Sequence, residues 1–293
     1  MPDKRKLLGL IPVAFVLLWS TGFIGAKYGL PYAEPFTLLM YRMYITLGAF
    51  LLLIRIFNGR WPDTRGALHS MVVGALVHAS YLGGVFSAIK SGMPAGLISL
   101  LVGLQPILTA VVARGWLGER INAVQGGGLL LGLVGVAMIL ANRGQGTGSA
   151  AYGPDALLYA LIALIGISLG TLYQKRHCSG VNLLTGAFYQ FLSTALIMTA
   201  LSFMFETGKI LWEPQFIFSL LWLVFGLSIT AILLLMLMIR EGAAAKVASY
   251  FYLTPPVTAI MAWLLFDERL DMLAVGGMVI AVSGVYLVAR GPD

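Results

Sequence analysis

The chain has 293 residues, of which 59% are hydrophobic and only 11% are charged. A soluble globular protein carries about 25% charged residues, so this composition excludes a soluble fold and predicts a membrane protein. The net charge of +7 does not indicate nucleic-acid binding, because the basic residues stand singly or in short groups between apolar runs, as topology signals do.

Long apolar runs, taken in chain order, predict an all-α protein with ten transmembrane helices. Each run approaches about 20 residues, the length that a helix needs to cross a hydrocarbon core about 30 Å thick. The first run follows a basic start, MPDKRK, and is interpreted as an uncleaved span because more spans follow it. The expected spans are 8–28, 35–57, 67–89, 93–114, 121–141, 155–174, 183–205, 216–239, 243–265 and 271–289.

The placement of Lys and Arg predicts the orientation of these spans. With the N-terminus in the cytoplasm, 13 of the 19 basic residues fall on the cytoplasmic side, 5 fall on the outer side, and Arg42 lies inside a span. The positive-inside rule then places both chain ends in the cytoplasm of a bacterial-type inner membrane.

The fourth and ninth spans carry a proline at the same place. When the sequence is shifted by 149 positions, Pro106 aligns with Pro255, and the "ER" of "GER" and of "DER" after the two spans align as well. Proline removes a backbone hydrogen bond and interrupts a helix, and an interruption at membrane depth belongs within protein or beside a water-filled cavity. The pair predicts hinges at Pro106, Pro255 and Pro256.

This alignment predicts two repeats, residues 1–145 with spans one to five and residues 150–293 with spans six to ten. Because each repeat has an odd number of spans, the second must enter the membrane from the opposite side. Inverted repeats of this kind are typical of secondary transporters, which bind their substrate near the midplane where the repeats meet.

Ten spans in two halves, the matched prolines, and the "GER" and "DER" motifs resemble the drug/metabolite transporter superfamily, and most closely its EamA-type permeases. The resemblance implies transport of a small metabolite by alternating access, with the first four spans of each half lining the cavity. Members of the superfamily export amino acids, other metabolites or toxic compounds, and some import metabolites.

Polar side chains inside the spans are the candidates for substrate binding, because such groups are costly in a membrane. Arg42 lies about 10 Å into the second span, where it faces the cavity or extends outward to pair with Glu34. His78 is the candidate for proton coupling, or else it bonds to a neighbouring helix. The predicted cavity residues are Trp19, Ser20, Arg42, His78, Tyr81, Gln105, Tyr173, Tyr189, Tyr250 and Thr254.

All twelve acidic residues lie in predicted loops or at span ends. The lack of a carboxylate at the midplane disfavours exchange of a lipophilic cation for protons and favours a carboxylate-bearing or zwitterionic substrate. Glu119 and Glu268 are interpreted as structural ion pairs or helix caps. "GISLG", residues 166–170, matches a nucleophile elbow, but it lies inside a span with no acid nearby and does not predict an enzyme.

The sequence therefore predicts a transporter of a small polar or amphipathic metabolite and favours export of an amino acid or related carboxylate. A multidrug exporter is the alternative within transport, and a membrane scaffold is the alternative outside it. The expected partners are the small-molecule substrate and the lipid bilayer, with no nucleic acid, cofactor or metal. The chain is expected to be a monomer or a homodimer, because "GGGLLLG" can pack within one chain or between two.

Overall fold

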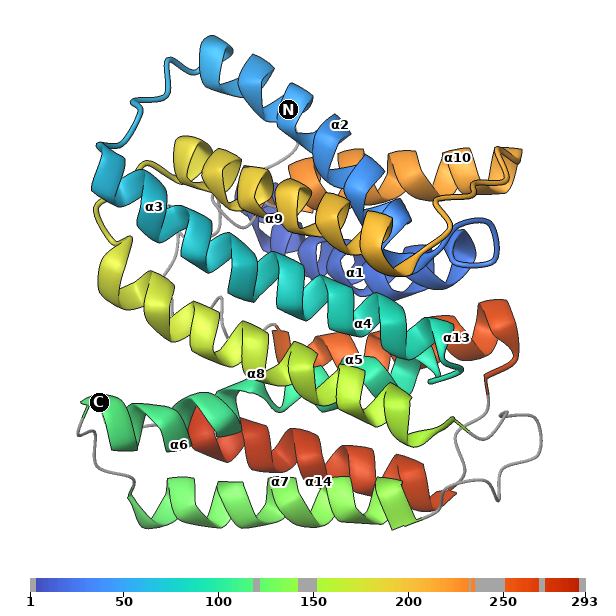
Figure 1. Cartoon of the computed structure of the whole chain (residues 1–293). Coiled ribbons are helices and arrows are strands. Elements are labelled where there is room, and N and C mark those ends of the chain that lie inside the picture. The colour runs from blue at the N-terminus through green and yellow to red at the C-terminus, as the bar shows by residue number, and fades with distance from the viewer. Residues whose placement is uncertain are drawn as a thin grey trace. The chain divides into compact units, whose positions relative to one another are not determined.

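The computed structural model describes residues 4–117, 122–141, 152–231, 233–234, 251–268 and 272–289. Within these residues the regular elements are helices (Figure 1), and the extended pairing is confined to one isolated antiparallel bridge between Ala33 and Ile210. The all-α fold class is confirmed.

Helices occupy all ten places where the sequence predicts spans. Seven described stretches are long and apolar enough to cross a membrane, and shorter apolar helices occupy the places of the fifth, ninth and tenth spans. The elements are α1 (Lys4–Gly29), α2 (Pro35–Ile56), α3 (Thr64–Val73), η1 (Gly74–Ser80), α4 (Tyr81–Lys90), α5 (Ala95–Gly103), α6 (Gln105–Leu117), α7 (Ala123–Ala141), α8 (Pro154–His177), α9 (Leu183–Phe205), α10 (Pro214–Leu221), η2 (Trp222–Ala231), η3 (Phe251–Leu253), α13 (Thr254–Phe266) and α14 (Met272–Ala289).

The two predicted proline breaks are present, at matching positions. In the fourth span α5 ends at Gly103 and α6 begins at Gln105, so that Pro106 is the second residue of a new helix. In the ninth, the 3₁₀ turn η3 precedes α13, whose second residue is Pro255. The first turn of a helix tolerates proline because its N–H groups have no helical partner. Each proline therefore begins a helical segment instead of kinking a continuous one.

A second matched irregularity, which the sequence analysis did not predict, lies in the third and eighth spans. Both contain a π-helical stretch, η1 between α3 and α4 and η2 after α10. When η1 is shifted by the same 149 positions it becomes 223–229, which lies inside η2. Such wide turns are rare and often mark functional sites.

The helices pack into two compact units, and each unit draws helices from both halves of the sequence. In unit 1 (Met1–Ile24, Met93–Tyr152 and Gly226–Asp293), α7 packs along α14 and α5 along α13. In unit 2 (Gly25–Gly92 and Gly153–Phe225), α2 packs along α9 and α4 along α8. The predicted repeats, 1–145 and 150–293, are thus combined in each unit, and the packing does not test where one repeat ends.

Close packing of α7 on α14 accounts for the glycine-rich motif in the fifth span. A Cβ atom on Gly284 would lie 2.5 Å from the amide nitrogen of Gly132 and 2.6 Å from the carbonyl oxygen of Gly128. Glycines four residues apart let two backbones approach in this way. This face of the motif therefore packs within the chain.

Glutamates cap two of the helices. In unit 1, Glu268 of the "DER" motif lies within hydrogen-bond distance of the amide nitrogens of Ala95 (3.2 Å) and Gly96 (3.5 Å), at the start of α5. The expectation of a helix cap is confirmed for Glu268, whereas Glu119 lies outside the described residues.

The second cap joins α2 to α9 in unit 2. Glu206, directly after α9, accepts hydrogen bonds from the amide nitrogens of Phe36 and Thr37, both at 2.7 Å, and from the Thr37 hydroxyl at 2.8 Å. In return, Glu34 before α2 accepts from the amide nitrogen of Thr207 at 2.7 Å and from its hydroxyl at 2.8 Å. The negative charge of Glu206 also lies at the positive end of the α2 dipole.

Substitution of Glu206 by glutamine is expected to lower the free energy of unfolding by about 1–2 kcal/mol, because the amide loses the charge and one of the two acceptor oxygens at this helix end. Thermal unfolding of the purified protein measures the effect. Glu213→Gln is the matched control, because Glu213 precedes α10 without a side-chain capping bond. Equal stability of the two variants would contradict a stabilising role for the Glu206 cap.

Candidate functional site

A buried cluster of polar side chains lies in unit 2, where α2, the η1–α4 stretch and α9 pack together. Arg42 on α2 is only 6% exposed and is within electrostatic reach of Tyr81 and His78. Its burial argues against the alternative in which it extends outward, and the Glu34 carboxylate bonds to Thr207. A buried cation in a membrane helix costs free energy and marks a functional site by default.

His78 lies in η1 and faces α9. Its Nε2 is 3.3 Å from the side-chain oxygen of Gln190, and its ring stacks on Phe191 with 4.7 Å between the ring centroids. Because an amide oxygen can only accept a hydrogen bond, Nε2 carries the hydrogen of this bond. The bond to a neighbouring helix is thus formed, and proton coupling by His78 stays a prediction. Tyr81, at the start of α4, is 8% exposed.

Hydroxyl groups of α9 lie against the backbone of α3 and η1. The Ser193 hydroxyl is 2.8 Å from the carbonyl oxygen of Met71 and 3.0 Å from that of Gln190, and the Thr194 hydroxyl is 3.1 Å from that of Gly74 and 2.8 Å from that of Gln190. Irregular backbone within a membrane needs such polar neighbours from adjacent helices. Gly74 permits the close approach because it has no side chain where its backbone meets Gln190.

Glycines of α8 hold η1 from the other side. A Cβ atom on Gly166 would lie 2.8 Å from the carbonyl oxygen of Leu76, and one on Gly170 would lie 2.5 Å from a methyl group of Val77. These are the two glycines of "GISLG". The motif that resembles a nucleophile elbow is therefore a helix-packing motif, and Ser168 between its glycines is fully buried.

Several other predicted cavity residues meet within unit 1, at the second proline break. The Ser20 hydroxyl is 2.8 Å from the carbonyl oxygen of Val16 and 3.4 Å from that of Thr254. Trp19 lies edge-on against Phe251, at 5.1 Å between ring centroids. Thr254 opens α13 and is buried, and its hydroxyl has no hydrogen-bond partner among the described residues.

The remaining candidates are Gln105, Tyr173, Tyr189 and Tyr250. Gln105 opens α6 and is half-buried, and Tyr250 lies outside the described residues. The hydroxyl of Tyr173 is 2.8 Å from Nδ1 of His69, and Tyr189 lies against Trp61 with 5.9 Å between ring centroids. Both tyrosines belong to the end of unit 2 where α3 and α9 begin.

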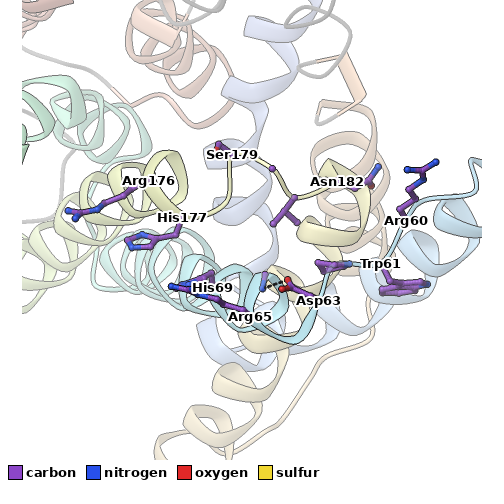
Figure 2. Close-up of a pocket in the computed structure, with 13 residues that line it drawn as sticks. Arg60, Trp61, Asp63, Arg65, His69, Arg176, His177, Ser179 and Asn182 are labelled. Carbon is purple, nitrogen blue, oxygen red and sulfur yellow. Dashed lines mark hydrogen bonds between the residues drawn. The ribbon is translucent and has the colours of Figure 1, made fainter.

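That end of unit 2 contains a cavity of about 730 Å³ (Figure 2). His69 and His177 contribute to its wall, and their rings stack at 4.8 Å. Sequence analysis missed both histidines. The signal available was the spacing of Tyr173 and His177, which lie four residues apart on one face of α8. Their contact with His69, more than 100 residues earlier, could not be predicted from spacing.

Buried polar groups among apolar helices, with irregular backbone at matching places in two halves, are how secondary transporters bind solutes within a membrane. The protein is a multi-pass membrane transporter and not an enzyme. It belongs to the EamA-like transporter family, whose model matches residues 7–141 and again residues 155–290. The predicted resemblance is confirmed, and the fold is that of a ten-helix protein built from two five-helix repeats.

Relatives match nearly the whole chain. An uncharacterized transporter of Bacillus subtilis, YvbV, is 29% identical and is matched over 98% of this chain and 92% of its own length. An uncharacterized inner membrane transporter of Escherichia coli, YedA, is 26% identical over 98% and 95% of the two chains. A probable amino-acid metabolite efflux pump of Escherichia coli is 24% identical over 97% and 95%. A crystal structure with 20% identity covers 96% of both chains with a TM-score of 0.64, which supports the fold.

Proposed function

We propose that the protein exports a small metabolite with a carboxylate group, an amino acid or a close relative of one, across the plasma membrane. The observation that carries this proposal is the burial of Arg42 within electrostatic reach of Tyr81 and His78. A guanidinium group offers paired donors that match the two oxygens of a carboxylate. The similarity to a probable amino-acid metabolite efflux pump supports the same substrate class and direction.

The surroundings of Arg42 fit a zwitterionic or amphipathic solute. Arg42 binds the carboxylate, and the Tyr81 hydroxyl and the Gln190 amide bind further polar atoms. The Phe191 ring, which stacks on His78, provides an apolar wall. The acids among the described residues lie at helix ends or in connections. A lipophilic cation therefore meets no carboxylate within the described spans, which disfavours the multidrug alternative.

Alternating access requires helices that bend at defined places. The breaks before Pro106 and before Pro255 and Pro256 serve as hinges in this proposal, together with the π turns η1 and η2. All four lie at matched positions of the two repeats. A scaffold without transport would need no such matched irregularities, so their presence favours transport.

The proposed arrangement in the membrane has both chain ends in the cytoplasm and a single chain or a homodimer as the working unit. Labelling each terminus from either side of intact cells checks the topology. A label applied from outside should reach the two termini only after the membrane is made permeable.

Counterflow in proteoliposomes tests the function. Vesicles that contain the purified protein are preloaded with unlabelled amino acids, small carboxylates or cationic dyes, and uptake of the corresponding labelled compound is measured. We expect accumulation with a carboxylate-bearing compound and none with the dyes. Accumulation of dyes alone would support the multidrug alternative, and the lack of any counterflow would support a scaffold.

His78→Gln is expected to abolish export driven by a pH gradient while counterflow, which needs no gradient, continues. Glutamine can still donate a hydrogen bond to Gln190 but cannot carry a proton between two charge states. The measurement compares flux with and without an imposed pH gradient in the same vesicles. His69→Gln is the control, because it replaces a histidine outside the cluster around Arg42. Undiminished gradient-driven flux in His78→Gln would exclude a coupling role for His78.

A further inference from the structure

The cavity at the end of unit 2 is formed by two connections that are far apart in the sequence. One runs from α2 to α3 and the other from α8 to α9, and Figure 2 shows them facing each other across the opening. The lining residues that carry a charge or an imidazole are Arg60, Asp63, Arg65, His69, Arg176 and His177. The cluster around Arg42 shares none of these residues.

Positive charge dominates this cavity. Three arginines line it, Arg60, Arg65 and Arg176, together with two imidazoles. The acid in its wall is Asp63, whose Oδ1 already accepts a hydrogen bond from the amide nitrogen of Gly66 at 2.9 Å. Both α3 and α9 begin here, and the positive ends of their dipoles add to the field, whereas α8 ends here and its negative end offsets part of that contribution. An anion is the ligand that such an environment stabilises.

The lining side chains are held in place by contacts around the cavity. The Tyr173 hydroxyl bonds to His69, and the ring of His69 stacks on that of His177. Trp61 lies edge-on against Phe188 at 5.4 Å between centroids, and the carbonyl oxygen of Arg60 accepts a hydrogen bond from Thr185 at 2.8 Å. The walls are thus fixed by α8 and α9, while the exposed side chains of Arg60 and Arg65 can adjust to a ligand.

The arginines are distributed around the opening. Arg65 and His69 lie one turn apart on α3 and beside each other in Figure 2, whereas Arg60 and Arg176 stand at opposite ends and extend outward. A ligand that enters therefore meets Arg65 beside the two imidazoles, and Arg60 and Arg176 would reach it by turning their side chains inward. The volume of about 730 Å³ admits a polar group much larger than a monatomic ion.

We propose that this cavity is an anion site for a phosphate group, either the headgroup of an anionic phospholipid or a soluble phosphate. Arginine binds phosphate oxygens with paired hydrogen bonds. The cavity lies at the ends of apolar helices, the level at which lipid headgroups and water meet a membrane protein. The site is separate from the cluster around Arg42, and the proposal does not depend on which substrate is transported.

The double substitution Arg60→Gln and Arg65→Gln tests the site. The purified protein is placed in phosphatidylcholine nanodiscs, and the shift in thermal midpoint is measured when phosphatidylglycerol replaces part of the lipid. In a second arm, inorganic phosphate is added to the phosphatidylcholine nanodiscs at constant ionic strength, with chloride as reference. Arg55→Gln is the matched control, because Arg55 is an exposed cation at the end of α2 that does not line the cavity.

We expect phosphatidylglycerol to raise the midpoint of the unsubstituted protein and of Arg55→Gln, and the double variant to lose most of that shift. A response to inorganic phosphate that the double variant loses would identify a soluble phosphate as the ligand. The proposal would be overturned if the double variant and Arg55→Gln showed equal shifts in thermal midpoint, both with phosphatidylglycerol and with inorganic phosphate. Both arginines are exposed, so we expect the double variant to fold, and Arg65→Gln alone provides a milder second test.

Discussion

Replacement of Arg42 by glutamine is expected to weaken binding of a carboxylate substrate by about 10- to 100-fold, which corresponds to the loss of a hydrogen bond to a charged group. Glutamine is shorter and neutral, and it cannot form the paired bonds of a guanidinium group. Because Arg42 is buried, water does not replace the lost interaction. Binding is measured with the purified protein, using the carboxylate compound that gives counterflow.

Arg55→Gln is the control for this effect, since Arg55 is an exposed residue of the same helix that lies outside the cluster. It should bind the compound as the unsubstituted protein does. If Arg42→Gln keeps full affinity while its fold is intact, Arg42 does not contact the substrate, and its burial then serves the packing of α2. A lysine variant separates charge from geometry, because Arg42→Lys keeps the charge and loses the paired donors.

Gly74→Ala is expected to destabilise unit 2 by about 2–3 kcal/mol, as overpacking of a tight contact does. The added methyl group would meet the backbone carbonyl oxygen of Gln190, and its Cα atom at 2.6 Å, so that a helix has to move and not merely a side chain. The same displacement would separate His78 from Gln190. We therefore expect the variant to lose transport as well as thermal stability.

The matched control is Gly48→Ala on α2, where an added methyl group meets no atom of the described residues within 4 Å. Alanine is the better helix former, so this variant should unfold no earlier than the unsubstituted protein. Thermal unfolding of both variants in the same detergent makes the comparison. If Gly74→Ala is as stable as Gly48→Ala and transports normally, neither stability nor transport requires the close approach of η1 to α9.

The sequence alone was enough to predict the class of the protein and the places of its ten helices. A bilayer imposes one length and one polarity on every segment that crosses it, so each span can be recognised without knowledge of its neighbours. The breaks before Pro106 and Pro255 were predictable for the same reason, because the missing N–H of proline acts within its own helix. The resemblance to EamA-type permeases also rested on features of this local kind.

Contacts between residues far apart in the sequence decided which polar groups lie together. The choice of Glu206 as the cap of α2, the bond between His78 and Gln190, and the stack of His69 on His177 each join residues more than 100 positions apart. The π turn in η1 lies against hydroxyl groups of α9, and no pattern within the third span indicates that contact. Composition and proline chemistry act along the chain and determined the helices. Only the packing of one helix against another determined which polar groups meet, because a buried group takes whichever partner the fold brings within reach.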